Sequence, residues 1–333
     1  GDDESGKIIE RLLQEQGVKS YLQRDPNLKT TVKLRVVARQ QQLIRLDFEK
    51  APTHEALLNK LEQFQSLLND VDAVVFSDYG KGGLTHVTQM IAAAKAAGKK
   101  LVVGYILRHH PSWIKFIDIA QELGKPLVMR MNLNQQSHGY MWDVHRNLMK
   151  SLSPIVDCGV HYIDVMCQMA RSKPLSVTAI GARLTNDIPE GNYNYGQLQI
   201  RFEDGSVGWY EAGWGPMMSE TAFFVKDVIG PKGSVSIVMA ETSGGVKSDD
   251  INAHTKTNQI LWHHADMKTP DTRIDMSDEP SHDDLCEREQ RYLLKAIREN
   301  IDLTDHMNDA VKSLKIVLAA DQSIHEGRIV LLA

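Results

Sequence analysis

Asp157 and His161 are the residues of this sequence whose types and spacing best fit catalytic chemistry. They lie four positions apart in Pro154-Ile-Val-Asp157-Cys-Gly-Val-His161-Tyr-Ile-Asp164. A carboxylate and an imidazole that point the same way can bind a hydroxyl group and take its proton, as the oxidation of an alcohol beside a hydride acceptor requires. The alternative is an ion pair on a helix surface, worth about 0.3–0.5 kcal/mol.

A helix over about 155–170 would give this pair its common direction. Apolar residues recur on one stripe of that segment, at Val156, Val160, Ile163 and Cys167. The adjacent stripe then carries the polar residues Asp157, His161, Asp164 and Gln168.

The composition is that of a globular protein with room for two domains. The chain has 333 residues, 42% of them hydrophobic and 24% charged, with a net charge of −5. This balance gives no general electrostatic reason to bind nucleic acid or an anionic membrane, so small molecules or other protein chains are the expected partners. No apolar run approaches the roughly 20 residues of a membrane span and no signal-like start is present, so a cytoplasmic location is expected.

No metal site is predicted. Cys158, Cys167 and Cys286 are widely spread, without the spacing of a metal-ligand or redox pair. Neighbouring histidines on a strand point to opposite faces, so His109-His110 and His263-His264 are predicted to be ordinary surface or core residues.

The first hundred residues predict an α/β fragment. Helices are expected at 5–17, 53–68 and 84–97, and two strands joined by a polar turn at 30–48. Short apolar strands are expected at 73–76 and 101–106, flanking a glycine-containing loop at 80–83. The last strands and helix would form one parallel β-α-β unit.

The remainder predicts an α+β domain with a large open, mainly antiparallel sheet. Asp204-Gly205 is a strong hairpin signal because a tight primed turn needs positive φ. Strands are expected at 127–134, 175–184, 195–203, 206–213, 221–229, 234–239 and 328–332. Helices are expected at 111–122, 155–170, 283–300 and 305–326.

From about residue 95 to the end, the chain resembles the C-terminal portion of the Gfo/Idh/MocA oxidoreductases, which act on sugars, inositols and related polyols. The resemblance rests on Leu101-Val-Val-Gly-Tyr-Ile-Leu-Arg108-His-His-Pro111, the segment of Asp157 and His161, Phe202-Glu-Asp-Gly205, Ile229-Gly230-Pro-Lys-Gly233 and the helix at 309–323. It implies that His161 is the acid/base and that Asp157 binds substrate. It also implies a substrate-binding place for Arg108 and Tyr105.

The same resemblance implies NAD or NADP as the cofactor, but its binding is in doubt. The family holds the dinucleotide at a glycine-rich turn that opens a helix, and no Gly-x-Gly-x-x-Gly occurs in this sequence. Gly80-Lys-Gly82-Gly83 has the wrong spacing. Glu49-Lys50-Ala51-Pro52 is a poor match to the family's Glu-Lys-Pro element. The cofactor-binding residues are therefore unknown.

Residues 1 to about 100 resemble a middle segment of the ribokinase-like (PfkB) sugar kinases, closest to heptose 7-phosphate kinases. The resemblance rests on Gly1-Asp-Asp-Glu-Ser-Gly6, on the segment from Thr30 to Glu49, and on Ser77-Asp78-Tyr-Gly-Lys81-Gly82. The segment lacks the kinase's N-terminal strands and its late Gly-Ala-Gly-Asp element, so phosphoryl transfer has lost its main parts. A basic cluster could hold a sugar phosphate or form a solvated strand face, at Lys33, Arg35, Arg39 and Arg45.

These observations predict a chimeric chain, whether natural, engineered or a product of faulty assembly, with a truncated Rossmann-like or ribokinase-like β-α-β domain at 1–100 and the α+β domain at 101–333. The expected function is an oxidoreductase acting on a polyol or sugar with NAD(P), impaired by the missing dinucleotide loop. A sugar-kinase fragment and a non-catalytic scaffold are the alternatives. Trp209, Tyr210 and Trp214 could stack on a sugar or pack a core or interface, and a homo-oligomer through the open sheet is expected.

Overall fold

The computed structural model describes most of the chain and divides it into two compact units. The described residues are 1–38, 41–48, 54–74, 76, 84, 86–221, 224–239, 247–248, 250, 257–266 and 268–332. The units are Gly1–Leu101 and Val102–Ala333, and each is described by itself.

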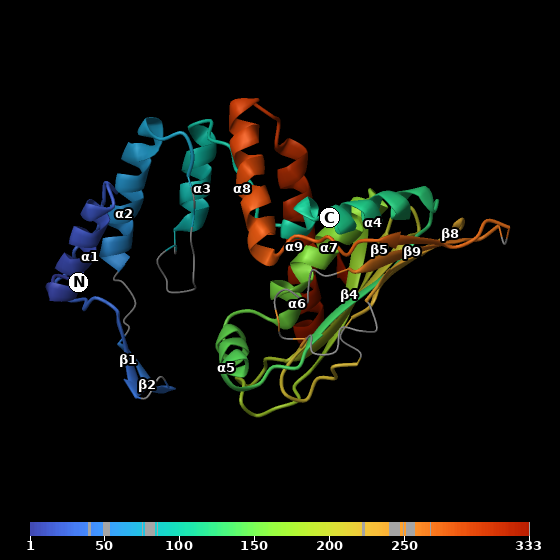
Figure 1. The fold of residues 1–333 in the computed structure, drawn as a ribbon, viewed down its shortest axis with the longest axis horizontal. Coiled ribbons are helices and arrows are strands. Elements are labelled where there is room, and N and C mark those ends of the chain that lie inside the picture. The colour runs from blue at the N-terminus through green and yellow to red at the C-terminus, as the bar shows by residue number, and fades with distance from the viewer. Residues whose placement is uncertain are drawn as a thin grey trace. The chain divides into compact units, whose positions relative to one another are not determined.

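The described residues of the first unit form one hairpin and three α-helices (Figure 1). The helices are α1 (Glu4–Glu15), α2 (His54–Leu67) and α3 (Val87–Ala96), and a 3-10 turn at Leu68–Asp70 follows α2. β1 (Val32–Ala38) pairs antiparallel with β2 (Gln41–Phe48). The predicted helices and strand pair thus form within a few residues of their expected positions.

Asp3 fixes the start of α1. Its carboxylate accepts hydrogen bonds from the backbone N–H of Gly6 and of Thr30, at 2.8 and 2.7 Å. These bonds, the one from Thr30 first, lower the pKa of Asp3 to about 2 because they favour the charged form.

The predicted β-α-β unit is wrong for the residues that the structure describes. Ala73, Val74 and Phe76 lie in no strand, and neither do residues 101–105; the glycine loop at 80–83 lies outside the described residues. A parallel strand forms only beside another strand that takes up its N–H and C=O groups. The described part of this unit contains only the antiparallel β1–β2 pair.

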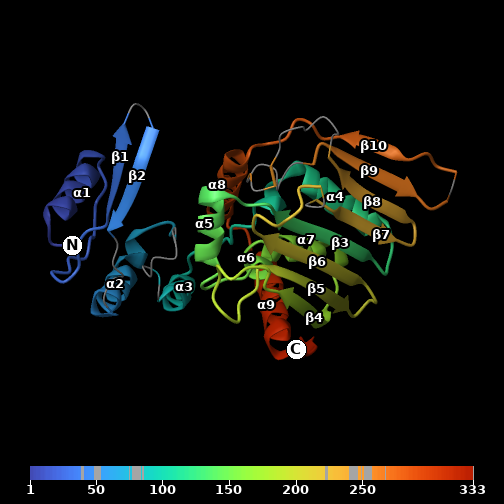
Figure 2. The ribbon, with the colours of Figure 1, turned by 90° about the horizontal axis from the view of Figure 1, so that it is seen from below.

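The second unit is built on a nine-stranded, mainly antiparallel sheet (Figure 2). Its spatial order is β10-β9-β8-β7-β3-β6-β5-β4-β11, and only β3 and β6 run parallel. The strands are β3 (Val128–Gln135), β4 (Pro174–Ala182), β5 (Tyr195–Phe202), β6 (Val207–Trp214), β7 (Lys226–Gly230), β8 (Gly233–Val238), β9 (Gln259–His264), β10 (Thr272–Asp275) and β11 (Val330–Leu331). The predicted open antiparallel sheet is confirmed.

Helices cover one face of this sheet (Figure 1). They are α4 (Pro111–Glu122), α6 (Pro154–Asp157), α7 (Gly159–Ala170) and α9 (Thr304–Glu326). One core fills the layer between them and the sheet, including Phe116, Met131, Ile163, Met166, Ile200, Tyr210 and Val317. The remaining helices are the 3-10 turn η2 (Ile106–His109), α5 (Gly139–Leu148) and α8 (His282–Arg298).

The hairpin between β5 and β6 turns where the sequence predicts it. Gly205 has φ of +83°, and the Phe202 N–H donates to the Ser206 carbonyl oxygen at 2.9 Å. Tyr210 and Trp214 of β6 are fully buried, so these two aromatic residues pack in the core. α5, β9 and β10 were not predicted from the sequence. β9 has three consecutive apolar residues and β10 has one, so neither strand alternates in a regular way.

No helix in the described part of the chain is long and apolar enough to cross a membrane.

A buried lysine stands out in the core. The Lys226 ammonium donates to the carbonyl oxygen of Asn132 and lies 4.7 and 4.3 Å from the ring centres of Tyr162 and Phe224. No carboxylate pairs with it among the described residues. Burial lowers its pKa to about 7, because the charged form loses its hydration.

Replacing this lysine should stabilise the protein in a pH-dependent way. Lys226→Met is expected to raise the free energy of unfolding at pH 7 by about 1–4 kcal/mol, because it removes a buried charge without a carboxylate. Between pH 7 and 10.5 the unfolded lysine is protonated and the folded one is neutral, so only the wild type gains stability as pH rises. The advantage of the variant, measured by urea denaturation, should therefore shrink with pH. A constant advantage, or the same trend in the exposed control Lys232→Met, would contradict this assignment.

Candidate active site

A cavity of about 290 Å³ lies in the second unit, beside the break between α6 and α7. Both predicted catalytic residues line it. The other lining residues come from η2, β3, α5, α7, α8 and the α6–α7 junction: Ile106, Leu107, Leu133, Gln135, Met141, Val144, His145, Leu148, Cys158, Tyr162 and His282.

The helix that carries the pair is interrupted. α6 ends at Asp157 and α7 begins at Gly159, so the single helix expected over 155–170 is two helices joined at Cys158. A Cβ atom on Gly159 would lie 2.8 Å from the ring of Tyr210, closer than real contacts allow. Glycine at this position therefore lets α7 approach β6 and sets the depth of His161 in the cavity.

Asp157 lies in surroundings that favour its neutral form. Burial raises the pKa of its carboxyl, and the nearby Cys158 thiol, 3.7 Å from Oδ2, opposes that rise only in part. A carboxyl group here can accept a hydrogen bond from a ligand hydroxyl when ionised, and donate one when protonated.

His161 is arranged to remain neutral. Burial lowers the pKa of the imidazole, and the charge of Asp164 acts in the opposite direction. The Tyr105 ring meets the His161 ring edge-on, with centres 5.5 Å apart. The buried Nδ1 of His161 has no hydrogen-bond partner among the described residues. A neutral imidazole is the form that can take a proton from a hydroxyl group.

Arg108 and Asp164 form a buried bidentate ion pair behind His161. Arg108 Nε and Nη2 donate to the two carboxylate oxygens at 2.7 and 2.6 Å, and Gln168 donates to the same carboxylate at 2.8 Å. Asp164 and Gln168 share a stripe with His161, as predicted, but they do not line the cavity. The two parallel hydrogen bonds orient the guanidinium and the carboxylate relative to each other. Each group also compensates a buried charge that would be costly alone.

The structure places Arg108 and Tyr105 away from the cavity wall. Arg108 lies over the Tyr105 ring at 5.1 Å, and the Tyr105 hydroxyl lies 3.3 Å from both the Ala310 carbonyl oxygen and the Ser313 hydroxyl. Arg108 also contacts His306. Neither residue is among those that line the cavity, and their substrate-binding role stays a prediction.

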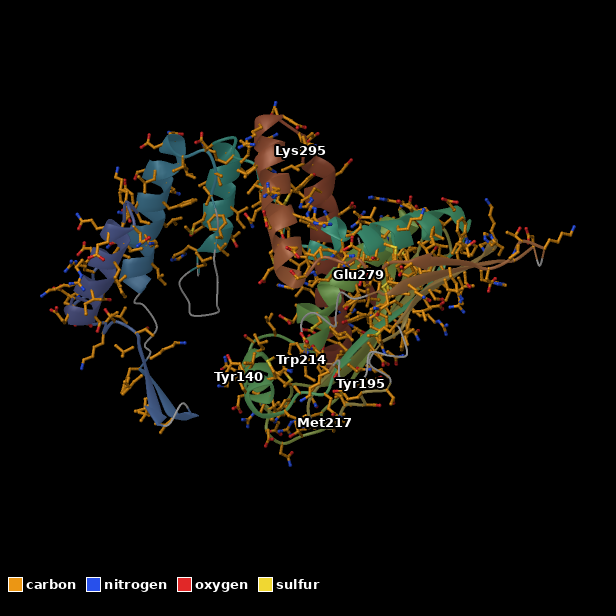
Figure 3. All side chains as sticks on the ribbon, viewed as in Figure 1. Tyr140, Tyr195, Trp214, Met217, Glu279 and Lys295 are labelled. Carbon is orange, nitrogen blue, oxygen red and sulfur yellow. The ribbon has the colours of Figure 1, made fainter. Side chains whose placement is uncertain are left out.

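Several of the residues that line the cavity were not predicted from the sequence. His145 stacks on Trp214 with ring centres 4.5 Å apart, and its Nδ1 lies 2.9 Å from the Ser137 hydroxyl. Trp214, at the end of β6, is labelled in Figure 3. Gln135 accepts a hydrogen bond from the Trp214 indole at 2.7 Å. The helical spacing of four α5 residues could have revealed this wall, at Met141, Val144, His145 and Leu148.

The described residues contain neither a cluster of metal ligands nor a glycine-rich turn between a parallel strand and a helix. No group of three His, Cys, Asp or Glu in the described part of the chain could hold a metal. A dinucleotide needs a glycine-rich turn between a parallel strand and a helix. In the first unit the described strands form an antiparallel hairpin, α3 follows His86, and residues 77–83 lie outside the description.

Comparisons with known proteins find the same two families as the sequence analysis. Residues 117–236 match the family model of the GFO/IDH/MocA C-terminal domain, and residues 1–135 match that of the pfkB family carbohydrate kinases. A kinase-like segment precedes an oxidoreductase-like domain. The two resemblances predicted from the sequence are confirmed.

The curated relatives match the kinase-like segment. The Bifunctional protein HldE of Methylococcus capsulatus is 47% identical over 103 residues, which are 31% of this chain and 22% of the relative. The D-beta-D-heptose 7-phosphate kinase of Bordetella bronchiseptica is 47% identical over 94 residues, 28% of this chain and 30% of the relative. The chain thus spans under a third of the length of either relative.

The similar solved structures are oxidoreductases. The aldose-aldose oxidoreductase of Caulobacter crescentus, complexed with glycerol, has a TM-score of 0.60 at 18% identity and covers 85% of this chain and 90% of its own. A putative myo-inositol dehydrogenase of Sinorhizobium meliloti has a TM-score of 0.54 at 17% identity, covering 82% and 79%. At these identities the likeness is one of fold.

The charge of Asp164 should be measurable at His161. Asp164→Asn is expected to lower the pKa of His161 further, because it removes the nearby anion and leaves Arg108 unpaired. Asp157→Asn is the matched control, since Asp157 does not contribute to that shift. NMR titration of the labelled imidazole gives both values. An unchanged His161 pKa in Asp164→Asn would contradict the electrostatic link.

Proposed function

We propose that the second unit is the substrate-binding part of a Gfo/Idh/MocA-type oxidoreductase that acts on a polyol or sugar. The observation that supports this most directly is that Asp157 and His161 line one cavity, in a fold similar to known oxidoreductases. Asp157 would hold a substrate hydroxyl, and neutral His161 would accept its proton. The cavity volume suits a small molecule rather than a macromolecule.

The hydride acceptor in this proposal is NAD or NADP. Structures of similar fold include an oxidoreductase of Agrobacterium radiobacter in complex with NAD+ and GenD2 in complex with NAD. A nicotinamide dinucleotide supplies a carbon that accepts hydride from the substrate carbon. This chain's own contribution would be to orient the hydroxyl group and to remove its proton.

We further propose that redox turnover is impaired. The sequence contains no Gly-x-Gly-x-x-Gly, and the described residues supply no strand–turn–helix of the required kind. A base that removes a proton cannot complete the oxidation when the hydride has no acceptor. The chain would then retain substrate binding with little or no turnover.

Dinucleotide binding can be measured directly. Fluorescence titration of the full chain with NADH and NADPH is expected to show no saturation at micromolar concentrations, because backbone donors for the pyrophosphate are missing. Micromolar binding of either nucleotide would contradict the proposed impairment and would support a complete NAD(P)-dependent oxidoreductase.

Polyol binding should depend on both cavity residues. Inositols and hexoses are expected to raise the melting temperature of the wild type. Asp157→Ala should weaken their affinity about tenfold, because the hydrogen bond between the carboxyl group and a ligand hydroxyl is lost. His161→Gln should weaken it less, and His263→Gln, on the distant β9, should behave as the wild type. An equal rise in melting temperature in all four proteins would show that the polyol does not bind in this cavity, and would contradict the proposal.

The kinase-like segment supports a second candidate function. Its 47% identity to the D-beta-D-heptose 7-phosphate kinase of Bordetella bronchiseptica favours residual affinity for a phosphorylated heptose. The sequence has no Gly-Ala-Gly-Asp element, so binding without phosphoryl transfer is the most that we propose. Isothermal titration with a heptose 7-phosphate tests it, and absence of heat at millimolar ligand would reject it.

Self-association through the open sheet face stays a proposal. Neighbouring strands there align three half-exposed apolar residues in one row, Val207, Val128 and Ile229. Light scattering on the eluted protein tests the proposal, and a monomer would reject it.

A further inference from the structure

A second cavity, of about 140 Å³, lies in the same unit and shares no lining residue with the first. It is formed by the connection between α5 and α6, by the residues that precede β5 and by the last turns of α9. The lining residues are Met149, Lys150, Ser151, Leu152, Ser153, Asn192, Tyr193, Asp321 and His325.

Two glycines fix the aromatic wall of this cavity. Gly181 of β4 and Gly196 of β5 are register partners. A Cβ atom on Gly196 would lie 2.7 Å from the Tyr193 ring, and one on Gly181 would lie 3.0 Å from it. The Tyr193 ring therefore fills the space that two cross-strand side chains would occupy, and close packing against the two glycines holds it in place.

Tyr193 and Ser153 together orient the carboxylate of Asp321. The Ser153 hydroxyl donates to Asp321 Oδ1 at 2.7 Å, and the Tyr193 hydroxyl donates to the same oxygen. Asp321 Oδ2 receives no hydrogen bond from the described residues, and Asp321 forms no ion pair with them. One wall of the cavity thus presents a fixed anionic acceptor to an incoming donor.

A cationic side chain, Lys150, and an imidazole, His325, lie at other points of the same cavity. His325 follows Asp321 by one turn of α9, and its ring centre lies 6.4 Å from that of Tyr193. The exposed Lys150 ammonium contacts the Asn147 side-chain oxygen at 3.3 Å and makes no ion pair with Asp321. The side-chain amide of Asn192 donates to the Met149 carbonyl oxygen, which leaves its own oxygen as a further acceptor.

We propose that this cavity binds a small zwitterion of the α-amino acid type. The ligand ammonium would donate to Asp321 and to the oxygen of Asn192, and the ligand carboxylate would face Lys150 and His325. Opposite charges within one ligand match the separation of charge along the lining. The volume of about 140 Å³ is below the roughly 300–1,000 Å³ of pockets for drug-sized ligands, so it suits a smaller ligand.

Ser153 connects this cavity to the candidate active site. Its hydroxyl accepts a hydrogen bond from Val156 N–H at 3.1 Å, and its carbonyl oxygen accepts one from Asp157 N–H at 3.0 Å. A ligand on Asp321 would therefore change the surroundings of the residue that starts α6. The backbone amide of Asp157 should report binding by its NMR chemical shift.

Four small probes of similar size separate the proposed ligand from its alternatives. Titration of the full chain at pH 7 with L-serine should saturate the shifts of Ser153, Asp157 and Asn192. Ethanolamine carries the ammonium alone, glycolate the carboxylate alone, and glycerol neither. Each should bind at least tenfold more weakly than serine, since each loses one or both charge-assisted contacts. Equal binding of any of the three, or no saturation by serine at roughly 10 mM, would overturn the proposal.

Two variants and one control locate the binding. Asp321→Asn keeps an acceptor for Ser153 and Tyr193 but removes the charge, so serine affinity should fall tenfold or more. Lys150→Ala changes an exposed residue, cannot disturb the core, and should also weaken serine. His263→Gln changes a residue of β9 that lines neither cavity, and it should bind serine as the wild type does. Unchanged affinity in Lys150→Ala together with Asp321→Asn would overturn the assignment.

Discussion

The close contact between α7 and the sheet is the constraint on which the second unit depends. Gly159 allows α7 to approach the Tyr210 ring, and Gly208 makes room on β6 for the sulfur of Met166. A side chain at either glycine would hold the helix away from the sheet and open the core beneath it. His161 lies on α7 itself, two residues after Gly159, so this contact helps to place its ring on the wall of the cavity.

Burial acts in opposite directions on the two candidate catalytic groups. It raises the pKa of Asp157 and lowers that of His161, because in each case the charged form loses hydration. The charge of Asp164 opposes the shift at His161, and the Cys158 thiol opposes the shift at Asp157. A neutral imidazole with an orphaned Nδ1 beside a carboxyl group is therefore a property of the folded environment, and it supports proton transfer as the chemistry of the proposed function.

The β1–β2 hairpin of the kinase-like unit has an exposed apolar face. It places three apolar cross-strand pairs on one face, and all six side chains are exposed: Val32 and Phe48, Leu34 and Leu46, Val36 and Ile44. The apolar segments at 73–76 and 101–105 form no strand in their described residues. Local pattern was sufficient for the antiparallel hairpin, whose partner strand is next in sequence, but not for parallel strands, whose partners must come from elsewhere in the chain.

The sequence by itself determined the helices and strands with regular patterns, the hairpin at Asp204-Gly205, both family resemblances and the pairing of Asp157 with His161 at one site. These depend on local periodicity, on turn residues and on short motifs, which contacts between distant segments change little. Only the tertiary structure decided that Arg108 pairs with Asp164, that His145 and Gln135 complete the cavity, and that Tyr193, Ser153 and Asp321 form a second one. The last three lie up to 168 residues apart and meet only when the sheet, α6 and α9 are packed together. No period or motif encodes such contacts, because their energy exists only between segments that folding has brought into reach.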